Sequence, residues 1–63
     1  MKNLQVGYRI QVRLFPKKLR EGEIETILNG GWVGFRPDHS SKIIVLKEGD
    51  EVLKVWDAAG NAL

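Results

Sequence analysis

Hydrophobic and polar residues alternate most clearly between positions 8 and 14 of this 63-residue chain. The apolar positions are Tyr8, Ile10, Val12 and Leu14, and the polar positions between them are Arg9, Gln11 and Arg13. Alternation with a period of two predicts a strand that turns one face to a core and the other to solvent. Pro16 has no amide hydrogen to donate to a neighbouring strand, so we expect this strand to end there and a polar loop to cover residues 17–21.

The next two strands are predicted by alternation and by turn residues. Residues 22–28 place Ile24, Thr26 and Leu28 on one face, whereas Ile27 breaks the pattern and indicates a bulge. Asparagine and two glycines follow at positions 29–31, and they tolerate the positive φ angles that tight hairpin turns require. We therefore expect residues 32–36 to pair back onto residues 22–28.

The second half of the chain predicts two more strands. Residues 37–41 have the proline, aspartate and serine content of a loop. The apolar run 43–46, within a strand expected over residues 42–47, is typical of a strand that is covered on both faces. Residues 48–50 predict a tight reversal into a fifth strand over residues 51–56, and residues 57–63 form a tail with room for one more turn.

Five short antiparallel strands in a chain of this size can bury one core by curling round on themselves. The sequence thus predicts an all-β fold, a five-stranded antiparallel small barrel, as a single domain with its core at 8–56 and its tail at 57–63. In the order of its strands and turns, the chain from Tyr8 to Trp56 resembles the Src-homology-type (SH3-like) small barrel.

A second resemblance covers less of the chain. The segment that starts at Gly22 is similar to the start of the second strand in the Sm-like RNA-binding family. Leu28 and Val33, however, fall near the positions where that family has an acidic residue and an asparagine, and residues 1–6 are too short for its leading helix. Neither the ring assembly nor the nucleotide pocket of that family is therefore expected here.

Composition limits the classes of function. With 43% hydrophobic and 29% charged residues the chain has the make-up of a folded domain, but one too small for an enzyme with a deep pocket. It has no cysteine and one histidine, so we expect no disulfide, no metal site and no cofactor. No segment has the apolar length of a signal peptide or a membrane span, which favours the cytoplasm and no membrane partner.

Charge is divided unevenly along the chain. The first twenty residues carry six basic and no acidic side chains, whereas residues 21–63 carry eight acidic and four basic ones. A one-sided basic surface attracts polyanions, so we expect a non-enzymatic module that binds DNA or RNA with low sequence specificity. The candidate nucleic-acid-binding residues are Arg9, Arg13, Lys17, Lys18 and Arg20 for the phosphates, with Trp32 and Arg36 stacking on or flanking bases.

Two other interpretations remain open. Arg9 and Arg13 could instead pair with Glu23 and Glu25 on the neighbouring strand, which would neutralise the basic face. The protein could also be an adaptor or a homo-oligomer in which tryptophans anchor a protein interface and the basic segment of one copy meets the acidic segment of another.

Catalysis is the least favoured class. His39 lies between Asp38 and Ser40, but neighbouring loop residues project in different directions and do not form a triad. Glu23 and Glu25 share one open strand face, which offers no pocket to raise the pKa of one of them.

Overall fold

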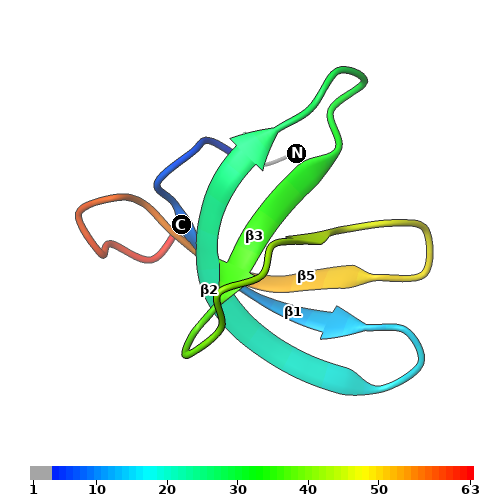
Figure 1. Cartoon of the computed structure of the whole chain (residues 1–63). Helices are drawn as coiled ribbons and strands as arrows, with labels where there is room; N and C mark the ends of the chain where they lie inside the picture. Colours follow the sequence, from blue (N-terminus) through cyan, green and yellow to red (C-terminus); the bar gives the residue numbers. More distant parts are fainter. Residues whose placement is uncertain (1–3) are drawn as a thin grey trace.

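The computed structural model describes residues 4–63, and in them it contains strands and turns but no helix. The five strands are β1 (Arg9–Leu14), β2 (Lys18–Ile27), β3 (Val33–Pro37), β4 (Ile44–Val45) and β5 (Glu51–Trp56). They form one antiparallel sheet in the order β4-β3-β2-β1-β5 (Figure 1). The predicted all-β, five-stranded antiparallel fold is confirmed. Lys2, part of the basic N-terminal segment, lies outside the described residues.

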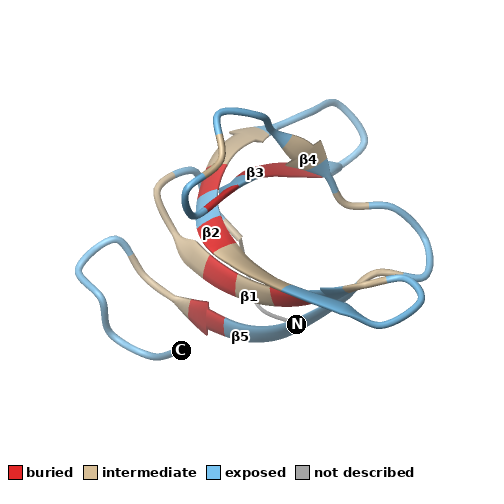
Figure 2. Ribbon diagram, turned by 60° about the horizontal axis from the view of Figure 1, so that its bottom comes forward, coloured by how far each residue is buried: buried red, intermediate tan, exposed pale blue. Residues whose placement is uncertain are grey.

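The sheet curls so that β3 and β4 lie across the core from β1 and β5 (Figure 2). No strand pairing joins β4 to β5 within residues 4–63, so the sheet is not closed into a barrel. Two features account for the opening. β4 has only two residues to offer a partner. The tail also occupies the free edge of β5, where Trp56 pairs with Ala62 and the Leu63 amide donates to the Val55 carbonyl at 2.9 Å.

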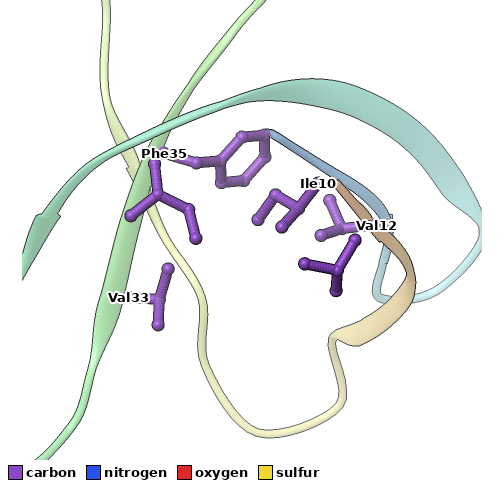
Figure 3. Close-up of a cluster of buried hydrophobic side chains, with 6 residues drawn as sticks. Ile10, Val12, Val33 and Phe35 are labelled. Atoms are coloured by element: carbon purple, nitrogen blue, oxygen red, sulfur yellow. The ribbon is translucent and has the colours of Figure 1, made fainter. Parts of the chain in front are cut away.

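A small hydrophobic core fills the concave side of the sheet (Figure 3). Its buried members are Ile10, Val12, Ile24, Val33, Phe35 and Val55. The strand alternation explains this set, because Ile10 and Val12 from β1 and Val33 and Phe35 from β3 occupy every second position and so share a face.

β2 is longer than the sequence predicts. It begins at Lys18, so the polar loop expected over residues 17–21 is wrong, and the turn contains only residues 15–17. Residues 18–21 pair with β1, where Leu14 faces Lys18 and Gln11 faces Glu21, and this ladder satisfies their backbone groups whatever their side-chain polarity. The bulge in β2 falls between Ile24 and Thr26 rather than at Ile27.

The turns follow the prediction more closely than the fourth strand does. Gly30 and Gly31 adopt φ angles of 87° and 86°, as the hairpin requires. The expected strand over residues 42–47, covered on both faces, is wrong, because β4 contains two residues and Ile43 and Val45 remain 49% and 42% exposed. β4 is an edge strand whose inner side alone meets the core, where Ile44 packs.

Candidate functional site

Arg9 and Arg13 project from the outer face of β1, as the alternation predicts, but both are neutralised. The Arg9 Nε donates to Glu21 Oε2 at 2.8 Å, and its Nη2 donates to Asp38. The hydrogen bonds to these carboxylates raise the pKa of Arg9 above its usual value, and the bond to Asp38 has the larger effect. Arg13 donates to Glu51 on β5. The predicted basic face of β1 is therefore a row of ion pairs.

Arg36 is neutralised as well. Its Nε lies 3.7 Å from Glu25 Oε1, across the β2–β3 pair. The expected pairing of Arg9 and Arg13 with Glu23 and Glu25 is therefore wrong. Both arginines form ion pairs, but Arg9 pairs with Glu21 and Asp38 although Glu23 is its direct partner in the register, and Arg13 pairs with Glu51.

The seven predicted binding residues do not share one face. Lys18 and Arg20 stand opposite Leu14 and Val12 in the β1–β2 register, which places them on the concave side of the sheet, away from the outward arginines. Trp32 lies beyond the other end of β2, about 30 Å along the strand from Lys18 at roughly 3.3 Å per residue. It points outward, as predicted.

The predicted cations that escape neutralisation lie at the turn between β1 and β2. The side-chain ammonium groups of Lys17 and Lys18 make no salt bridge or hydrogen bond to any described residue. The guanidinium of Arg20 donates only to the carbonyl of Leu19, at 2.7 Å. Lys47, on the loop between β4 and β5, is likewise in no salt bridge with residues 4–63.

Two of these cations, Lys18 and Lys47, line an open hollow of about 210 Å³ between the β1–β2 turn and the β4–β5 loop, which lie on the same side of the molecule in Figures 1 and 2. The hollow is lined by Leu14, Phe15, Pro16, Lys18, Ile44, Val45, Lys47 and Asp50. Phe15 is 70% exposed. We call the group formed by Phe15, Lys17, Lys18, Arg20 and Lys47 the cationic seam.

Asp50 ties the two sides of the cationic seam together. Its carboxylate accepts the Phe15 amide at 2.8 Å and the Lys47 amide at 3.0 Å. Both hydrogen bonds lower the pKa of Asp50, and the bond from the Phe15 amide has the larger effect. Phe15 also lies close over Gly49, since a Cβ placed on Gly49 would be 3.3 Å from the Phe15 Cβ and Cδ2. The position of Phe15 is therefore set by the β4–β5 loop.

Sequence reasoning missed Phe15 and Lys47. Lys47 is distant from the basic segment in sequence, and only the curl of the sheet brings its loop to the β1–β2 turn. Phe15 did carry a signal. It is an apolar residue directly before Pro16, at the point where the predicted strand ends and the chain reverses.

A second surface feature is an apolar patch on the outer side of β3 and β4. It consists of Leu28, Trp32, Ile43 and Val45, all more than two-fifths exposed. Gly34 lies among them, since it pairs with Val45 and a Cβ there would be 3.1 Å from the Ile43 Cγ2. The Leu28 amide donates to the Trp32 carbonyl at 2.7 Å at the hairpin end of the apolar patch.

No hydrogen bond links the side chains of Asp38, His39 and Ser40 in this described loop, so they do not form a catalytic triad. Asp38 is bound to Arg9, and the Ser40 hydroxyl accepts the Lys42 amide at 3.1 Å. His39 itself has a φ of 63° and lines an open polar hollow of about 370 Å³. Over residues 4–63 no three histidine, cysteine or acidic side chains gather in a way that could hold a metal ion.

Comparison with known proteins yields no matching family model, no matching curated protein and no matching solved structure. Neither the SH3-like nor the Sm-like resemblance therefore has support beyond the all-β antiparallel sheet. In the part of the chain that the structure describes, no helix has the length and apolar character needed to cross a membrane.

Proposed function

We propose that this protein is a non-enzymatic module that binds nucleic acid through the cationic seam. The observation that carries the proposal is the separation of charges. Every salt bridge among residues 4–63 uses Arg9, Arg13 or Arg36, whereas the lysines and Arg20 are in none, and of these unpaired cations Lys18 and Lys47 meet at one hollow. Cations without carboxylate partners are available to phosphates, and contacts to phosphates provide affinity without sequence specificity.

The proposal keeps part of the predicted site and replaces the rest. Lys17, Lys18 and Arg20 stay as phosphate-binding candidates and Lys47 joins them. Arg9, Arg13 and Arg36 each already lie beside a carboxylate, which reduces their attraction for phosphates relative to the unpaired cations, so we assign them no contact. Trp32 lies too far along β2 to act with the lysines.

The experiment is a salt titration of binding to a fluorescently labelled oligonucleotide. With four cations, we expect log K to fall with log [salt] at a slope of about −3 for a single strand, at roughly −0.7 per neutralised phosphate. The double variant Lys18→Gln/Lys47→Gln should halve the slope. The control is Arg13→Gln, which removes one cation that already has a partner, and it should leave the slope unchanged. No binding at low salt, or equal losses in both variants, would contradict the proposal.

The curled sheet with β5 beside β1 also supports our proposal that the chain is an SH3-like small barrel left open between β4 and β5. The cytoplasmic location stays a prediction.

A second candidate function is self-association, and the apolar patch favours it. The apolar patch contains a tryptophan, a residue type enriched at the centres of interfaces. With six buried core side chains among residues 4–63, the protein would gain stability from covering more apolar surface. Pairing between the basic segment of one copy and the acidic segment of another has less support, because Arg9 and Arg13 use those carboxylates within one chain.

Sedimentation velocity tests this second function. The wild-type protein should form dimers or larger species as its concentration rises, and Trp32→Gln should remain monomeric. Val6→Gln is the matched control, since Val6 is an exposed apolar residue outside the apolar patch. A wild-type protein that stays monomeric at high concentration would rule out self-association.

A further inference from the structure

We infer that the cationic seam selects single-stranded nucleic acid, with one base stacked on Phe15 and the phosphates on either side of that base bound by lysines. The inference rests on the proposed function and deepens it, since phosphate contacts alone would not distinguish a single strand from a duplex. It adds Phe15 as the residue that determines this preference.

The first argument is the presentation of the Phe15 ring. An aromatic side chain that is 70% exposed contributes little to the core and leaves its ring available. It is nonetheless held in place, because its amide is bound by Asp50 and its side chain lies against Gly49. A surface aromatic that is fixed before binding loses little conformational entropy when a base stacks on it.

The second argument is the distribution of charge around the ring. Lys18, at the start of β2, and Lys47, on the β4–β5 loop, bring a cation to the hollow from each of its sides, and the Asp50 carboxylate that also lines the hollow accepts the Phe15 and Lys47 amides. Lys18 and Lys47 line the hollow together with Phe15. A nucleotide chain that crosses the seam would place one base at the ring and a phosphate towards each group of lysines. This alternation of a flat apolar group with anions is the chemistry of a single strand.

The third argument excludes the duplex. In double-stranded DNA or RNA the bases are stacked on one another, and no base face is available to a side chain at the protein surface. A duplex could reach the lysines but not the Phe15 ring. We therefore expect the free energy of stacking to be added for a single strand only.

The experiment compares a labelled oligothymidylate with a duplex of the same length by fluorescence anisotropy at low salt. The wild-type protein should bind the single strand more tightly. Phe15→Ala should weaken single-strand binding about 5- to 150-fold, the range expected for one stacked base, and leave duplex binding and the salt slope unchanged. Phe15→Tyr keeps an aromatic ring and should retain the affinity.

The matched control is Leu19→Ala, which truncates an exposed apolar side chain on β2 that points away from the hollow. It should change neither affinity. Melting curves of each variant show whether it is folded at the assay temperature, and the wild-type comparison of single strand with duplex keeps the test decisive if Phe15→Ala is not.

The outcomes separate the two proposals. Equal wild-type affinity for single strand and duplex, or an equal loss of both in Phe15→Ala, overturns the stacking inference and leaves the proposed function standing. Failure to bind either nucleic acid overturns both. An acidic peptide containing one phenylalanine serves as a competitor. If it displaces the oligonucleotide at similar concentration and Phe15→Ala abolishes its binding, the seam is a site for an acidic protein segment and the inference is wrong.

Discussion

Replacing Gly22 by alanine should destabilise this protein more than any other glycine-to-alanine change within its strands. Gly22 is buried on β2, where it pairs with Pro37 of the neighbouring strand β3. A Cβ at this position would lie 2.1 Å from the carbonyl oxygen of Arg36 and 2.7 Å from the Cα of Pro37. Both contacts are with backbone atoms, so no side-chain rotation can relieve them, and β2 and β3 must move apart.

The size of the effect follows from these distances. Ordinary contact to a Cβ begins at 3.4 Å, so the carbonyl of Arg36 must shift by more than 1 Å. Overpacking of this kind costs about 1–3 kcal/mol, and we expect about 3 kcal/mol here because the obstacle is backbone. A chain of this length has a total stability of about 3–9 kcal/mol. The melting temperature should therefore fall by about 12–24 °C.

Gly34→Ala is the matched control. Gly34 is also a strand glycine, but its Cβ would meet side-chain methyl groups, 2.7 Å from the Thr26 Cγ2 and 3.1 Å from the Ile43 Cγ2, near the surface. These groups can give way, so the loss should stay at about 1 kcal/mol. Thermal denaturation followed by circular dichroism compares the two variants. A Gly22→Ala protein that melts as high as Gly34→Ala would refute the reasoning.

Three further changes test other parts of the structure. Phe35→Ala should cost about 3–5 kcal/mol in urea unfolding, because it removes the largest fully buried side chain. Arg9→Met should cost only about 1 kcal/mol or less, since the side chains of Arg9 and Glu21 are both 39% exposed and their ion pair is screened by solvent. Folding lowers the pKa of Asp50, so its stabilising effect is complete above the unfolded-state value of about 4 and is lost as the pH falls through the folded-state value. The melting temperatures of the wild type and Asp50→Asn should accordingly differ most at neutral pH and converge in acid, and parallel curves would contradict this.

The number, order and type of the strands could be predicted because their signals are local. The alternation that includes Ile10 and Val12 acts within a few residues, and so does the turn preference of the two hairpin glycines. Both features are present in the structure. The start of β2 could not be predicted in this way. Lys18 belongs to a strand because Leu14 pairs with it, and pairing satisfies the backbone even where the side chains are charged.

The candidate site could be predicted only in part, because the pairing of charges is not a local property. Asp38 and Glu51 neutralise Arg9 and Arg13 from elements that are distant in sequence. The unevenness of charge in the linear sequence is therefore cancelled at Arg9 and Arg13 but not at Lys17, Lys18 and Arg20. Lys17, Lys18 and Arg20, at the β1–β2 turn and the start of β2, and Lys47 on the β4–β5 loop are in no salt bridge with the described residues.

The sequence by itself determined which residues face inward along β1 and where the hairpin between β2 and β3 reverses, because side-chain alternation and the φ preferences of glycine are set by covalent geometry. The tertiary structure alone decided which carboxylate reaches which arginine, that β4 and β5 remain unpaired, and that Lys47 and Asp50 meet Phe15. These outcomes depend on the curl of the sheet, which is produced by packing all five strands around one small core and cannot be read from any single segment.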